Sequence, residues 1–96
     1  GDFLILKALR ESRGTAIAVT DEEILESQKN LAKQTGILLC PEGAATAAAL
    51  IKARQNGTIT IDAKVVLFNC ASGLKYPMPG LVQTFEPGQD IATVLD

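Results

Sequence analysis

The amino-acid sequence predicts an α/β fold with a mainly parallel sheet and covering helices. Three short apolar segments, at residues 15–19, 37–39 and 65–68, alternate with segments of helical composition. Such alternation favours parallel strands joined by right-handed crossovers. Small polar residues and a glycine follow the third apolar segment, at the edge where open α/β sheets bind ligands. We therefore expect the candidate site just after residue 68.

Length and composition indicate one small folded domain over residues 1–96, with a mainly irregular tail at 77–96. Hydrophobic residues make up 47% of the chain and charged residues 21%, as in globular proteins. The net charge of −2 offers no basic surface for nucleic acid, and no apolar run approaches the ~20 residues that span a bilayer. We therefore expect a cytoplasmic protein that binds neither nucleic acid nor a membrane. Because the chain begins with glycine, we expect a piece of a longer protein.

Composition excludes several common kinds of active site. The chain has no histidine, so Ser-His-Asp triads, Cys-His pairs and the usual zinc sites each lack a necessary member. Its two cysteines, Cys40 and Cys70, form no C-x-x-C pair, and the chain is not disulfide-dense. We therefore expect no metal site, and two thiols in a reducing compartment instead of a Cys40–Cys70 disulfide.

Two helices are expected in the first third of the chain. Residues 3–9 are apolar on almost every side of a helix, which predicts a mostly buried helix. We expect this helix to stop at residues 12–14, where Gly14 ends it. Thr20 and Glu23 form a capping box, which predicts the start of the second helix, and Gly36 suits its end. One face of this helix should pack against the sheet and cover it. The residues on that face are Ile24, Gln28, Leu31, Ala32 and Thr35.

The third helix is expected to begin at Pro41 and to stop at Asn56-Gly57. It is rich in alanine, a strong helix former with little bulk, which predicts close approach to a neighbouring element. Within the tail, residues 81–85 could add a strand and residues 90–95 a short helical turn.

Three places could carry chemistry, and each also has an ordinary structural interpretation. Backbone N–H groups of residues 69–73 could approach a ligand, or the segment could be only a tight turn. The amino end of the third helix offers free N–H groups near Glu42, whose carboxylate could simply stabilise the helix by about 0.3–1 kcal/mol. Lys75 is a formal Schiff-base candidate, although a surface lysine is the favoured interpretation.

Three motifs, in this order, resemble the C-terminal part of threonine synthases, which are pyridoxal-phosphate enzymes of fold type II. They are Gly1-Asp2-Phe3, Pro41-Glu42-Gly43-Ala44-Ala45-Thr46 and Asn69-Cys70-Ala71-Ser72-Gly73-Leu74-Lys75-Tyr76. The resemblance covers residues 1–76. It implies the large domain of a tryptophan synthase beta-subunit-like fold.

The resemblance implies a cofactor-binding role for Cys70. In this family a Ser or Thr at the matching position hydrogen-bonds the pyridine nitrogen of pyridoxal 5'-phosphate, and a neutral thiol, like a hydroxyl, cannot keep that nitrogen protonated. Cys40 and Glu42 would border the ring without being catalytic, and Lys75 is not the cofactor lysine. That lysine and the phosphate-binding loop are absent. We therefore expect no catalytic residue in this chain, no activity and no bound cofactor.

By resemblance, the parent enzyme is a lyase of threonine biosynthesis that converts O-phospho-L-homoserine and water into L-threonine and phosphate. Two alternatives stay open. Amino-acid dehydratases share the architecture and cofactor, while a stand-alone, non-catalytic α/β module would keep the turn for packing only. A piece of a larger fold would expose apolar faces, so we expect self-association or packing with the remainder of the enzyme.

Overall fold

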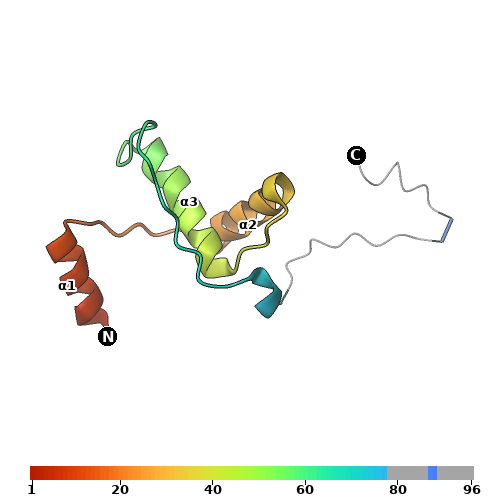
Figure 1. Cartoon of the computed structure of the whole chain (residues 1–96), viewed down its shortest axis with the longest axis horizontal. Helices are drawn as coiled ribbons and strands as arrows, with labels where there is room; N and C mark the ends of the chain where they lie inside the picture. The colour runs from red at the N-terminus through yellow and green to blue at the C-terminus, as the bar shows by residue number, and fades with distance from the viewer. Residues whose placement is uncertain (78–86, 89–96) are drawn as a thin grey trace.

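Helices provide the regular structure of the described part of the chain. The computed structural model describes residues 1–77 and 87–88, so the predicted strand at 81–85 and helical turn at 90–95 lie outside the described residues. The described elements are α1 (Asp2–Ser12), α2 (Asp21–Thr35), α3 (Pro41–Gln55) and the short 3-10 helix η1 (Gly73–Lys75) (Figure 1).

The predicted α/β fold with a mainly parallel sheet is wrong, because residues 1–77 contain no strand. The one pairing in this range is an isolated bridge between Leu39 and Ser72, and it is antiparallel. A strand is held by a ladder of hydrogen bonds to a neighbour about 4.8 Å away. Residues 15–19 and 65–68 have strand-like composition, but they border α3 and form no such ladder with each other. Apolar segments that run beside a helix thus have the composition of strands but, within residues 1–77, no partner strand to pair with.

The prediction that the first helix is mostly buried is also wrong. None of the residues of α1 is buried, and Phe3, Leu4 and Ile5 are 73%, 58% and 62% exposed. Figure 1 shows α1 apart from α2 and α3, which pack together. The helix ends close to the predicted stop, although Arg13, with φ 56°, adopts the left-handed conformation in place of Gly14.

The predicted ends of α2 are confirmed. The Thr20 hydroxyl oxygen accepts a hydrogen bond from the Glu23 N–H at 3.2 Å. Gly36 ends the helix with φ 73°, and its N–H donates to the carbonyl oxygen of Ala32. The helix packs against α3 instead of covering a sheet, and Thr35, expected on the packed face, is exposed.

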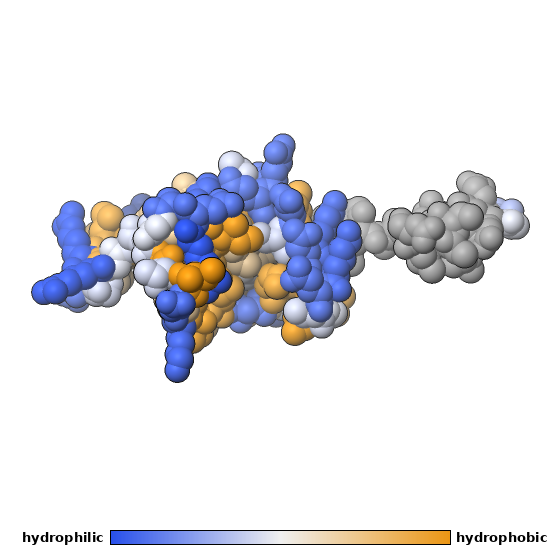
Figure 2. Space-filling model, turned by 90° about the horizontal axis from the view of Figure 1, so that it is seen from above, coloured by the Kyte–Doolittle hydropathy of each residue, from blue (hydrophilic) through white to orange (hydrophobic). Residues whose placement is uncertain are grey.

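The core lies where α2 meets α3, and it is small. The predicted bounds of α3 are confirmed, and its alanines allow the expected close approach. The buried hydrophobic residues are Cys40, Ala44, Ala47, Ala48 and Ala53. From α2, the buried Gln28 donates through Nε2 to the carbonyl oxygen of Leu39 at 2.7 Å. Because alanine carries little apolar surface, this core contributes little burial energy, and Figure 2 shows apolar patches left at the surface.

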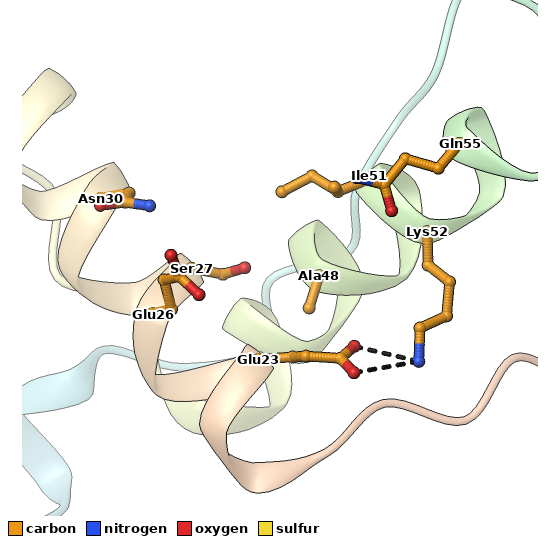
Figure 3. Close-up of a pocket in the computed structure, with 8 residues that line it drawn as sticks. All are labelled: Glu23, Glu26, Ser27, Asn30, Ala48, Ile51, Lys52 and Gln55. Atoms are coloured by element: carbon orange, nitrogen blue, oxygen red, sulfur yellow. Dashed lines mark hydrogen bonds and ion pairs between the residues drawn. The ribbon is translucent and has the colours of Figure 1, made fainter.

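An ion pair ties α3 to the start of α2. Lys52 Nζ lies 3.0 Å from Glu23 Oε2 (Figure 3), and it also donates to the carbonyl oxygen of Ala18 at 2.8 Å. Both charged side chains are 37% exposed, so the pair contributes at most about 1 kcal/mol. The pair lines a groove of about 330 Å³ between the two helices, together with Ser27 and Ala48.

Candidate functional site

The amino end of α3 and the segment at residues 69–73 meet in the structure. Cys40 N–H donates to the carbonyl oxygen of Ala71 at 3.3 Å, and Gly73 N–H donates to the carbonyl oxygen of Leu38 at 3.0 Å. These two bonds hold the segment beside the first turn of α3. Two of the places that the sequence indicated separately therefore form one site.

Cys40 lies at the centre of this site and caps α3. It is fully buried, and its Sγ accepts a hydrogen bond from the Gly43 N–H at 3.3 Å. The Cys40 thiol donates to Oδ1 of Asn69 at 3.6 Å. Serine, threonine, aspartate and asparagine are the preferred capping residues, so the helix start did not single out this cysteine as a cap. Nor did any spacing indicate its contact with Asn69.

Two glycines allow the backbone to approach this closely. A Cβ at position 43 would overlap Oδ1 of Asn69. A Cβ at position 73 would lie 2.5 Å from the carbonyl oxygen of Leu39 and 2.6 Å from Cγ of Leu38. The glycine at 73 is therefore required sterically, whereas a side chain at 43 would force Asn69 to turn away, and neither glycine adopts a left-handed conformation.

Cys70 brings a second thiol to the site. Its Sγ lies 3.8 Å from Cys40 Sγ, and the residue is exposed while Cys40 is buried. The hydrogen bond with Cys40 raises the pKa of the Cys70 thiol above the ordinary value for cysteine, and the nearby charge of Glu42 raises it further. Cys70 is therefore a neutral thiol at neutral pH. We call Cys40, Gly43, Asn69 and Cys70 the thiol cluster.

Tyr76 joins the edge of this site beside Glu42. The negative charge of Glu42 raises the pKa of the Tyr76 phenol, with smaller contributions from desolvation and from a hydrogen bond to the same carboxylate. The sequence analysis missed this pair, because the two residues lie far apart in the chain and no spacing rule connects them. Lys75 is exposed in η1, as predicted for a surface lysine.

The thiol cluster offers hydrogen-bonding chemistry through an exposed, neutral thiol next to the amino end of a helix. Within residues 1–77 and 87–88, no group of three His, Cys, Asp or Glu side chains could hold a metal ion. The groove of Figure 3 shares no residue with the thiol cluster, and its lysine is paired with Glu23. None of the helices described is long and apolar enough to span a membrane.

Comparisons with known proteins identify related sequences. A family model described as "Pyridoxal-phosphate dependent enzyme" matches residues 2–71. The chain is 42% identical over 82 residues to a threonine synthase of Methanocaldococcus jannaschii and 45% identical over 82 residues to one of Methanosarcina acetivorans. Each of these alignments covers 85% of this chain and 20% of the relative.

A plant protein is also similar in sequence to this chain. The chloroplastic threonine synthase 2 of Arabidopsis thaliana is 35% identical over 69 residues, which cover 72% of this chain and 13% of the relative. The chain thus spans about a fifth or less of the length of these curated relatives. No solved structure matches it.

Proposed function

The chain belongs to the pyridoxal-phosphate dependent enzyme family, and from this membership we propose that it forms part of an enzyme that converts O-phospho-L-homoserine and water into L-threonine and phosphate. The observation that carries the proposal is the identity of 42% and 45% to two threonine synthases across 85% of the chain. These relatives confirm the resemblance that the sequence motifs indicated. The reaction, the substrate and the lyase class assigned to this chain remain the proposal.

The thiol cluster fits the ring of the cofactor on chemical grounds. Bound pyridoxal phosphate supplies an electron sink. We assign Cys70 to the pyridine nitrogen, because it is exposed and because its raised pKa keeps it a neutral hydrogen-bonding group. A neutral thiol, unlike a carboxylate, does not hold the pyridine nitrogen in its protonated form.

In the proposed enzymatic reaction, Cys40 positions Cys70 and takes no chemical part. It is held on one side by the Gly43 N–H and on the other by Asn69 Oδ1, so without the cofactor its sulfur accepts the Cys70 S–H at 3.8 Å, and with the cofactor bound that S–H would turn to the pyridine nitrogen. We assign no catalytic residue to this chain, and Lys75, which is exposed in η1, keeps the interpretation of a surface lysine. Proton transfers would therefore be made by residues of the remainder of the enzyme.

Replacement of Cys70 tests this assignment in the full-length enzyme that contains the chain. Cys70→Ser should retain cofactor binding and release phosphate from O-phospho-L-homoserine within about threefold of the unchanged enzyme, because a hydroxyl is also a neutral donor. Cys70→Asp should lower the rate by about tenfold or more and shift the cofactor absorption spectrum, because its carboxylate favours a protonated pyridine nitrogen.

Lys75→Gln is the matched control, since it changes an exposed side chain of the neighbouring η1 and should leave rate and spectrum unchanged. Equal rates for Cys70→Asp and the unchanged enzyme would overturn the role of Cys70. Release of ammonia from serine or threonine, without phosphate release from O-phospho-L-homoserine, would instead assign the enzyme to the amino-acid dehydratases.

The exposed apolar residues indicate a packing partner. Val66 is 95% exposed and Phe68 77%, and both belong to the segment that leads to Cys70. Extended apolar surface favours association, so in the parent enzyme we propose that the remainder of the fold covers these residues. In the isolated chain a second copy should do so.

Sedimentation of the isolated chain checks this expectation. The weight-average mass should rise with concentration, and the double variant Val66→Lys/Phe68→Lys should remain nearer the monomer mass because charges oppose apolar burial. Lys64→Gln, at an exposed neighbouring position, is the control. A chain that stays monomeric at the highest soluble concentration would contradict the proposed packing surface.

A further inference from the structure

Two thiols from distant parts of the chain lie next to each other. Cys40 Sγ and Cys70 Sγ are 3.8 Å apart, although the residues are separated by 30 positions in the sequence, and both cysteines are free. A disulfide needs a sulfur–sulfur distance of about 2.0 Å, so the two atoms must approach by about 1.8 Å.

The surroundings suit a buried thiol beside an exposed one. Cys40 is fully buried and is held by the Gly43 N–H and by Asn69 Oδ1. Cys70 is exposed, and the hydrogen bond from Cys40 N–H to the carbonyl oxygen of the next residue, Ala71, keeps the two cysteines side by side. An oxidant can therefore reach the sulfur of Cys70. The sulfur of Cys40 is close enough to react with the oxidised sulfur of Cys70.

We propose that Cys40 and Cys70 form a reversible redox dithiol, which closes to an intramolecular disulfide when a hydroperoxide reaches Cys70. The Cys70 thiolate attacks the peroxide, its sulfur gains one oxygen, and one molecule of water leaves after protonation. The sulfur of Cys40 then displaces the hydroxyl group from the Cys70 sulfenic acid as a second water. In sum, two thiols are oxidised by two electrons and one hydrogen peroxide is reduced to two waters.

The hydrogen bond with Cys40, and to a smaller extent the nearby charge of Glu42, affect the pH dependence of this reaction through the pKa of Cys70. Among residues 1–77 and 87–88, the groups that face Cys70 are the Cys40 thiol and the Glu42 carboxylate, both of which raise the pKa of Cys70, and Tyr76 lies beside Glu42. Because only the thiolate attacks, a raised pKa lowers the reactive fraction at neutral pH. Oxidation should therefore be slower than for an ordinary cysteine at neutral pH, and it should accelerate as the pH rises.

Disulfide formation itself does not depend on the proposed enzymatic role. Its consequence for the cofactor rests on the proposed function, because a disulfide removes the S–H group assigned to the pyridine nitrogen. The first test therefore measures the bond in the chain itself, without cofactor or substrate. If the bond forms but the full-length enzyme proves to be a dehydratase, the redox inference stands while the proposed substrate does not.

The experiment treats the reduced 96-residue chain with hydrogen peroxide and follows its intact mass. The expected product is a monomer lighter by about 2 Da, with a cross-linked peptide pair that contains Cys40 and Cys70 and is restored by dithiothreitol. In a glutathione redox buffer, the folded chain should form the bond at least about tenfold more favourably than the same chain in urea, because folding supplies the proximity.

Single serine variants are the matched controls. Cys40→Ser keeps a good capping residue for α3, and Cys70→Ser changes an exposed position, so each should fold and neither should lose the 2 Da. Cys40→Ser should instead accumulate a sulfenic acid at Cys70 that reacts with dimedone. Products that carry only added oxygen in the unchanged chain, or equal bond formation with and without urea, would overturn the proposal.

Discussion

Replacing Gly73 by alanine is expected to destabilise the folded chain by about 2–3 kcal/mol. The new Cβ would lie 2.5 Å from the carbonyl oxygen of Leu39 and 2.6 Å from Cγ of Leu38, and the first of these is a backbone atom that cannot rotate away. Relief of the overlap must therefore move η1 away from the segment before α3. This movement breaks the hydrogen bond from Gly73 N–H to the carbonyl oxygen of Leu38.

Urea unfolding followed by far-ultraviolet circular dichroism measures this loss. Leu74→Ala is the control, because Leu74 is 79% exposed in the same short helix and should change stability by less than about 0.5 kcal/mol. The movement of η1 should also slow disulfide formation between Cys40 and Cys70. Unchanged stability of Gly73→Ala would show that residues 69–73 are not held against the start of α3.

Replacing Gly43 by alanine should destabilise the chain by about 1–3 kcal/mol, although alanine is the better helix former. In a helix interior, alanine would normally contribute about 0.5–1 kcal/mol relative to glycine. Here its Cβ would overlap Oδ1 of Asn69, which is itself the acceptor of the Cys40 thiol. Relief of the overlap turns the Asn69 side chain away and breaks its hydrogen bond with the Cys40 thiol, and this loss outweighs the gain in helix propensity.

A double-mutant cycle with Asn69→Ala isolates this conflict. Asn69→Ala alone removes the acceptor and should cost about 1 kcal/mol. In the double variant the overlapping side chain is gone, so the two changes should cost less together than separately, with a coupling energy of about 1–2 kcal/mol. Additive losses would mean that Asn69 does not lie over position 43.

Part of the candidate site could be predicted from the sequence. The amino end of α3 and residues 69–73 stood out because each combines turn residues with an apolar segment, and the structure brings them together. The role of Cys70 at a cofactor ring stays a proposal that came from the resemblance. The partnership of Cys40 with Asn69, and of Glu42 with Tyr76, was not predictable, because these contacts link residues about thirty positions apart.

The fold was predicted only where local rules decide it. The capping of α2 by Thr20 and the start of α3 at Pro41 were correct, since caps and first-turn residues act through bonds three or four positions along the chain. The sheet and the burial of α1 were wrong. Whether an apolar segment becomes a strand depends on which neighbour it meets, and composition does not contain that information.

The amino-acid sequence by itself determined the ends of α2 and α3 and the family of this protein. Tertiary structure alone decided that α3 packs against α2, that α1 stays exposed, and that Cys40 and Cys70 meet at 3.8 Å. The physical reason is the range of the interactions. Helix ends depend on hydrogen bonds within one turn, whereas the thiol cluster exists only once segments separated by some thirty residues have packed together.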